Sequence, residues 1–193
     1  MTKTLNVIVD TSGSMDEMGK IHLQRNLCRY AAQLSVLYKE KYKYVDIRLF
    51  QWSHNVLEIN LQDDGDVPAL RASGSADLSA LSDFILQCAG KTQKWDGIIL
   101  TDGGFPESDI SSYKEKIKSV TTNILAVAVG ADANHRELRE ISTCGGCYRA
   151  EDISAVIDRI VFDIKDVTVP NHINQVLFDY ARCKTDEEDN WGG

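Results

Sequence analysis

The sequence places one carboxylate and two hydroxyls at alternate positions directly after an apolar run. Asp10, Ser12 and Ser14 follow Leu5-Asn6-Val7-Ile8-Val9, where a predicted strand gives way to a loop. Their side chains present hard oxygen atoms from one short stretch of backbone. Hard divalent cations such as Mg²⁺ bind oxygen ligands of this kind and usually keep some waters besides. The pattern therefore predicts that these three residues ligate a metal.

A second carboxylate has the same local context much further along the chain. Asp102 follows the apolar run Ile98-Ile99-Leu100-Thr101, so it also lies at the carboxyl end of a predicted strand. In sheets of parallel strands, ligands sit outside the carboxyl ends of the strands, where the winding reverses. We therefore expect Asp10 and Asp102 to contribute to one metal site. Mg²⁺ is the expected ion, with Mn²⁺ or Ca²⁺ as alternatives.

The segments that must position these residues alternate between strand-like and helix-like patterns. This alternation predicts an α/β fold with a mostly parallel sheet and helices on both faces. The short connection Ser53-His54 indicates a hairpin, and hence one antiparallel strand. The predicted strands are 5–10, 44–52, 55–61, 95–101, 123–129 and 148–150, and the predicted helices are 20–41, 77–88, 106–120, 134–142 and 151–164.

Size and composition fit one globular domain with a tail. The 193 residues are 43% hydrophobic and 26% charged, enough to bury a core without cross-links. The net charge of -8 argues against binding to nucleic acid. No apolar run reaches the ~20 residues of a membrane span, and we expect no secretory leader before Asp10, because the apolar run 5–9 is too short for one. We expect a cytoplasmic protein with a domain at 1–168 and an acidic, partly disordered extension at 169–193.

The motifs resemble those of the von Willebrand factor A (vWA) family over residues 1–165. The metal-ion-dependent adhesion site (MIDAS) of that family begins with D-x-S-x-S after the first strand, which Asp10, Ser12 and Ser14 match. Its third motif is an aspartate after an apolar strand, often in a T-D-G context, which Thr101-Asp102-Gly103 matches. The resemblance implies a Rossmann-like fold with a six-stranded sheet and one antiparallel edge strand. It is strongest for bacterial stand-alone members inside the cell.

The second motif of the family is not matched. That motif is a threonine in the loop before the second long helix, and Ala76 stands at this position within Gly74-Ser75-Ala76-Asp77-Leu78. Alanine offers no ligand atom, and Ser75 would supply a hydroxyl only if the loop shifts by one residue. Water would fill the remaining coordination positions, because Mg²⁺ commonly keeps several. Two alternatives stay open: a metal site that functions without the threonine, or a metal-free scaffold with a degenerate site.

The resemblance implies a protein-interaction module without catalysis. A cation held by two aspartates and neutral hydroxyls keeps positive character, so an acidic side chain of a partner would complete its coordination. Members of the family inside the cell assemble complexes through this surface, which makes an AAA-type ATPase or an operon-encoded protein the expected partner. The enzyme alternative is a Mg²⁺-dependent phosphohydrolase with Asp10 as nucleophile, which lacks a second carboxylate because Ser12 stands there.

Two further features allow alternative interpretations. Cys144-Gly145-Gly146-Cys147 has C-x-x-C spacing, which we interpret as a tight glycine turn, with a reversible disulfide as the alternative. Phe105 follows Gly103-Gly104 and is equally compatible with an exposed aromatic on the rim of the site or with packing under the next helix.

Overall fold

The strands form one mixed sheet, which confirms the predicted α/β class. A computed structural model describes residues 2–90 and 94–164. The six strands of this part lie in the order β3-β2-β1-β4-β5-β6, and only the β2–β3 pair is antiparallel. Their bounds are β1 Lys3–Asp10, β2 Val45–Trp52, β3 Val56–Glu58, β4 Lys94–Thr101, β5 Thr121–Ala128 and β6 Cys147–Arg149.

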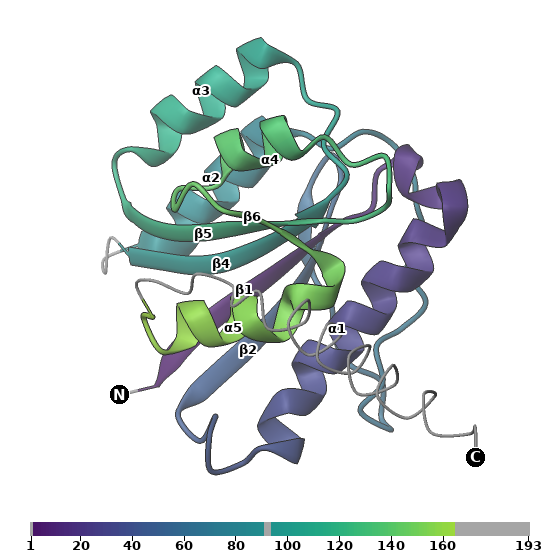
Figure 1. The fold of residues 1–193 in the computed structure, drawn as a ribbon, viewed down its shortest axis with the longest axis vertical. Coiled ribbons are helices and arrows are strands. Elements are labelled where there is room, and N and C mark those ends of the chain that lie inside the picture. Colours follow the sequence, from purple (N-terminus) through teal and green to yellow (C-terminus); the bar gives the residue numbers. More distant parts are fainter. Residues whose placement is uncertain (1, 91–93, 165–193) are drawn as a thin grey trace, which may run out of the picture. The chain divides into compact units, whose positions relative to one another are not determined.

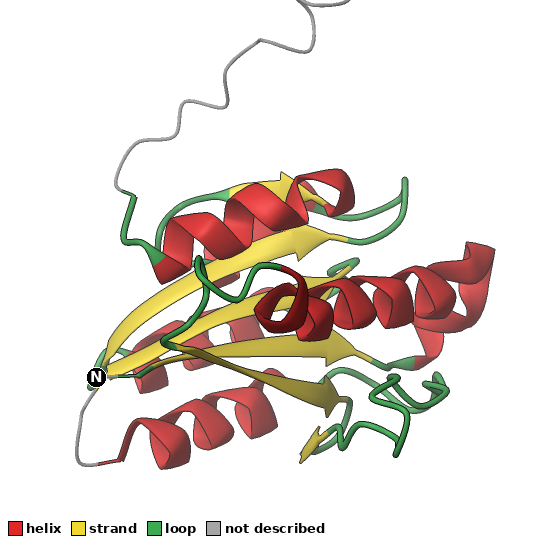
Figure 2. Ribbon diagram, turned by 90° about the horizontal axis from the view of Figure 1, so that it is seen from below, coloured by secondary structure: helices red, strands yellow, loops and turns green. Residues whose placement is uncertain are grey.

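Helices cover both faces of this sheet (Figures 1 and 2). Helices α1 (Lys20–Leu37) and α5 (Ile153–Val161) pack on one face and contribute to one apolar cluster. Helices α2 (Leu78–Ala89), α3 (Glu107–Ile117) and α4 (His135–Ile141) pack on the other face around a second cluster. Short 3-10 segments precede α1 and α5, namely η1 (Gly13–Gly19) and η3 (Ala150–Asp152).

Strand β1 lies in the middle of the sheet and is buried on both faces. Val7 and Val9 contact the α1/α5 cluster, whereas Ile8 between them contacts the α2/α3/α4 cluster. A parallel strand covered on both faces needs apolar residues at successive positions, which is why this segment reads as an apolar run rather than an alternation.

The winding of the sheet reverses beside β1. The chain passes from β1 to its neighbour β2 on one side and later adds β4 on the other side of β1. The reversal therefore falls between β1 and β4, and their carboxyl ends lie next to each other. Asp10 ends β1 and Asp102 directly follows β4, so the topology brings both carboxylates to the point where α/β sheets bind ligands.

Some element bounds differ from the sequence prediction. Helix α1 ends at Leu37 rather than Lys41, because Tyr42 turns inward, is 2% exposed and donates a hydrogen bond to Asp158 Oδ1 at 2.6 Å. Strand β3 is shorter than predicted, and its three residues pair only with the end of β2. Within residues 2–90 and 94–164, no helix is both long and apolar enough to cross a membrane. The predicted boundary at residue 168 and the extension 169–193 lie outside the described residues.

Candidate metal centre

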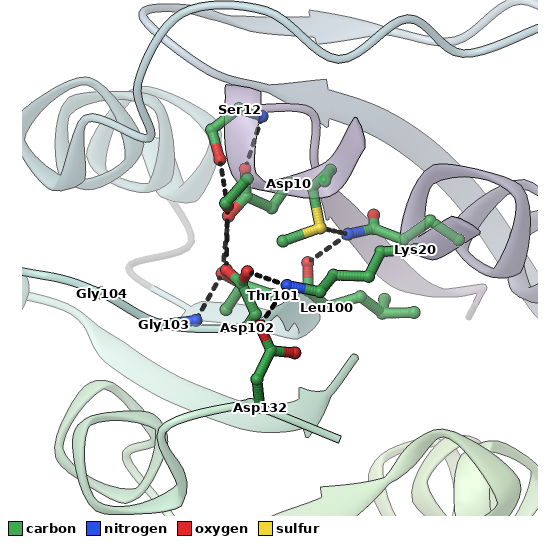
Figure 3. A network of polar contacts seen from close by, with 12 residues as sticks. Asp10, Ser12, Lys20, Leu100, Thr101, Asp102, Gly103, Gly104 and Asp132 are labelled. Carbon is green, nitrogen blue, oxygen red and sulfur yellow. Dashed lines mark hydrogen bonds and ion pairs between the residues drawn. The ribbon is translucent and has the colours of Figure 1, made fainter. Parts of the chain in front are cut away.

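Asp10 is fully buried and lies at the bottom of the site (Figure 3). Its Oδ1 accepts a hydrogen bond from the backbone N–H of Ser12 at 2.7 Å, and its Oδ2 accepts one from the Thr101 hydroxyl at 2.6 Å. Burial raises the pKa of Asp10 above its usual value, although the hydrogen bonds from Thr101 and Ser12 oppose this rise. Asp10 thus ties the loop after β1 to the end of β4.

The hydroxyls of that loop reach the second carboxylate. Ser12 Oγ lies 3.3 Å from Ser14 Oγ, and Ser14 Oγ donates to Asp102 Oδ1 at 3.2 Å. Ser12 and Asp102 are buried, whereas Ser14 is exposed. The structure therefore brings together the four residues that the sequence proposes as metal ligands, Asp10, Ser12, Ser14 and Asp102.

A buried lysine completes the cluster and was missed by sequence reasoning. The side chain of Lys20 is 2% exposed, and its Nζ donates to Asp102 Oδ2 at 2.8 Å and to Asp132 Oδ2 at 2.6 Å. Burial alone would lower the pKa of Lys20, but the hydrogen bonds with both carboxylates outweigh it and raise the pKa. One sequence signal existed, because a lysine at the first position of a helix opposes the helix dipole and needs a compensating anion.

Glu137 from α4 fixes the loop after β4. Its Oε2 accepts hydrogen bonds from the backbone N–H groups of Gly104 at 2.7 Å and Phe105 at 2.9 Å. Phe105 is 6% exposed, and its ring stacks on Trp52 with 5.8 Å between centroids. Of the two interpretations of Phe105, the structure supports packing in the core.

The loop that would carry the missing threonine lies beside the site. Ser73 N–H donates to the Thr11 carbonyl at 2.7 Å, and Gly13 N–H donates to the Gly74 carbonyl at 2.9 Å. Ala76 packs against the α2/α3/α4 cluster. Ser75 Oγ lies 3.5 Å from His54 Nδ1, and within the described part of the chain its side chain makes no hydrogen bond to the four proposed ligands.

The donor set fits a hard cation better than a soft one. The candidate ligands are carboxylate and hydroxyl oxygens, which suit Mg²⁺, Mn²⁺ or Ca²⁺, whereas structural zinc sites use cysteine sulfur and histidine nitrogen. Among residues 2–90 and 94–164, no group of three or more His, Cys, Asp and Glu side chains is arranged to hold a metal. A cation here would therefore depend on the hydroxyls of Ser12 and Ser14 in addition to the carboxylates.

The C-x-x-C segment lies away from these ligands, in the turn that leads into β6. Cys144 and Cys147 are both free thiols, and Gly145 between them has a positive φ of 67°. Cys144 Sγ donates to Asn123 Oδ1 at 2.8 Å, and Cys147 Sγ lies 3.3 Å from His135 Nδ1. The glycine turn is thus as expected.

Solved structures of low sequence identity share this architecture. The ArnB paralog VWA2 from Sulfolobus acidocaldarius is 16% identical, with a TM-score of 0.60, over 83% of this chain and 45% of that chain. An aerotolerance-related membrane protein from Bacteroides fragilis, solved with multiple mutations to serines, is 13% identical, with a TM-score of 0.57, over 82% of this chain and 98% of that one. Proximal thread matrix protein 1 from the mussel byssus, solved with a zinc-occupied MIDAS motif, is 14% identical, with a TM-score of 0.54, over 83% and 47%.

These likenesses show that the chain has a vWA-like fold. The chain spans slightly less than half the length of the first structures that it matches, 45% to 47%. No family model matches the sequence, and no curated protein matches it.

Proposed function

We propose that the protein is an interaction module that binds an acidic group of a partner protein through a divalent cation. Asp10, Ser12, Ser14 and Asp102 would hold this cation at the carboxyl edge of the sheet. The observation that carries the proposal is the 3.2 Å hydrogen bond from Ser14 Oγ to Asp102 Oδ1, because it joins the two motif segments at one point. Mg²⁺ is the proposed ion, since all candidate ligands are oxygens.

Each residue has a distinct part in this proposal. Asp10 fixes the loop through its bonds to Ser12 N–H and the Thr101 hydroxyl, and the two serine hydroxyls add ligands without adding charge. The bound cation would supply residual positive charge for an incoming carboxylate. Because Ala76 offers no oxygen, one more position is left to water or to the partner.

The chemistry of the partner follows from this arrangement. A net charge of -8 repels acidic proteins in general, so an exposed cation would give the surface one point of attraction for an Asp or Glu side chain. An AAA-type ATPase or an operon-encoded protein in the bacterial cytoplasm is the partner that we propose, on the resemblance to vWA proteins inside the cell.

A metal-free scaffold is the second candidate, and one observation favours it. The ammonium group of Lys20 already lies 2.8 Å from Asp102 Oδ2, so the carboxylate has a compensating charge without any metal. In this alternative the same face would bind a partner by shape and hydrogen bonds alone.

The phosphohydrolase alternative has less support. A nucleophilic carboxylate must approach the substrate phosphorus, but Asp10 is 0% exposed and both of its oxygens accept hydrogen bonds. Ser12 also leaves no general acid at the position where this chemistry would place one.

Calorimetric titration with Mg²⁺ and Mn²⁺ tests the proposal, using Ser14→Ala as the variant. Ser14 is exposed, so its loss should spare the fold, whereas Asp102→Ala would remove one of the two carboxylates that pair with the buried Lys20. We expect the variant to weaken metal affinity by about tenfold and to weaken Mg²⁺-dependent capture of a partner. The matched control is Ser108→Ala, because Ser108 is an exposed serine on α3.

Two outcomes separate the candidates. A metal affinity that falls by about tenfold in Ser14→Ala and is kept in Ser108→Ala supports the metal-dependent module. Neither heat nor a shift in melting temperature at millimolar metal, in the wild type and in a Lys20→Met variant that removes the neighbouring positive charge, would contradict it and favour the metal-free scaffold.

A further inference from the structure

Lys20 lies where a positive charge is unfavourable unless neighbouring carboxylates compensate it. It is the first residue of α1, where the positive end of the helix dipole repels a positive charge. Its side chain is 2% exposed, and a buried ammonium is costly unless it is paired. Both of its hydrogen-bond partners in the described chain are carboxylates, Asp102 from the end of β4 and Asp132 from the loop after β5.

The chain also leaves space for this lysine. Gly130 has a positive φ of 96°, and a Cβ atom there would lie 2.8 Å from Lys20 Cε and 2.7 Å from Asp132 Oδ1. Such distances are too short for real contacts, so a larger residue would push the lysine or the aspartate aside. The start of α1, the end of β4 and the loop after β5 therefore together position the ammonium group beside Asp102.

The two oxygens of Asp102 are divided between different neighbours. Oδ1 accepts from the Ser14 hydroxyl, on the side of the proposed metal ligands, and Oδ2 accepts from Lys20. A divalent cation bound at Oδ1 would lie close to the ammonium group across a single carboxylate. In a poorly solvated site, like charges at such separation repel strongly.

We propose that Lys20 is a resident cation that keeps the affinity of the site for divalent metals low, and that Asp132 moderates this effect by sharing the ammonium group. This inference rests on the proposed metal site. Metal binding would then depend on the partner, because an incoming carboxylate would neutralise the excess positive charge of the metal and Lys20. Binding of the metal and binding of the acidic group would then favour each other.

Calorimetric titration with Mn²⁺ alone tests the inference on the full chain. Lys20→Met keeps much of the side-chain volume and removes the charge, so we expect the Mn²⁺ dissociation constant to fall by about tenfold or more. Lys114→Met is the matched control, because it makes the same change of charge at an exposed ion pair with Glu140. It should leave the constant within about twofold.

Asp132→Asn gives a second test that does not depend on removing a buried ion. Asp132 is 43% exposed, so the variant should fold. Asp102 would then be the one carboxylate paired with Lys20 among the described residues, and the Mn²⁺ dissociation constant should rise by about threefold to fivefold. If Asp132 acts through Lys20, the double variant should match Lys20→Met within about twofold.

The outcomes separate this inference from the proposed function. Metal binding in the wild type that Lys20→Met leaves unchanged or weakens would overturn the role of Lys20 and leave the metal site in place. If Lys20→Met fails to fold, an unchanged constant in Asp132→Asn overturns it instead. Absence of Mn²⁺ binding in both the wild type and the folded Lys20→Met protein would overturn the metal site, and with it this inference.

Discussion

Asp10 is in a costly position for a carboxylate. It is 0% exposed, and burial raises its pKa above that of the same group in the unfolded chain. A group whose folded-state pKa is raised lowers stability as the pH rises from the ordinary carboxyl range through the raised value, and the full penalty is present above it. The metal-free protein therefore carries this charge at the expense of stability.

Asp10→Asn should make the metal-free protein more stable at neutral pH, by about 1 kcal/mol. The amide removes the buried charge and keeps the shape, its oxygen still accepts from Ser12 N–H, and its NH2 group can donate to the Thr101 hydroxyl oxygen. The same variant should lose metal binding. Melting curves with a chelator, recorded between about pH 4 and about pH 8, should show the advantage growing with pH and then levelling off.

The control for this variant is Asp46→Asn, which changes an exposed aspartate and should show no such trend. A neutral-pH melting temperature of Asp10→Asn below that of the wild type would contradict this account of Asp10.

Sequence reasoning could predict the carboxylates but not the lysine. The strand-end positions of Asp10 and Asp102, and the spacing to Ser12 and Ser14, follow from local patterns and the rule for parallel sheets. The contacts of Lys20 depend on segments that are far apart in the chain, and its own surroundings in the sequence carry only the weak signal of a cation at a helix start.

Helix α2 fixes the loop that lies beside the proposed metal ligands. Asp77 precedes the helix, and its Oδ1 accepts hydrogen bonds from the backbone N–H groups of Ser79 at 2.7 Å and Ala80 at 3.2 Å. The backbone N–H of Asp77 donates to the Ser53 carbonyl at 3.0 Å. This N-cap therefore joins the helix start to the β2–β3 turn, and the loop with Ser75 and Ala76 ends there.

Asp77→Ala should lower the free energy of unfolding by about 1 kcal/mol, the usual cost of losing an N-cap acceptor. For a domain of this size the melting temperature should fall by about 2–4 °C. Thermal denaturation checks this, with Asp77→Asn as the variant that keeps a capping oxygen and should stay near the wild type. Equal losses in both variants would show that the charge rather than the cap matters.

Element existence was predictable here, and element bounds were less so. The apolar periodicity gave all six strands and five α-helices in the right order within the described residues. The end of α1 was placed too late, because Lys39 and Lys41 fit a helix by propensity while the burial of Tyr42 decides the path of the chain. Tertiary contacts of this kind cannot be found in a local pattern.

At the scale of the whole domain, the sheet order determines where chemistry can occur. Because β1 lies between β2 and β4, the reversal of winding puts the carboxyl ends of β1 and β4 side by side. The alternation of strands and helices predicted this class of sheet, the short Ser53-His54 connection predicted one antiparallel strand, and the resemblance to vWA domains implied that this strand lies at the edge. Two residues at this edge oppose the binding of a cation, because Ala76 offers no oxygen ligand and Lys20 adds a positive charge.

A crystal of the full chain soaked in Mn²⁺ gives the most direct test of the cation itself. We expect one strong anomalous peak at the carboxyl edge of the sheet, within about 2.5 Å of the Ser12 and Ser14 hydroxyl oxygens and beside Asp102 Oδ1. Maps with no peak there at millimolar Mn²⁺, for both the wild type and Lys20→Met, would contradict this expectation.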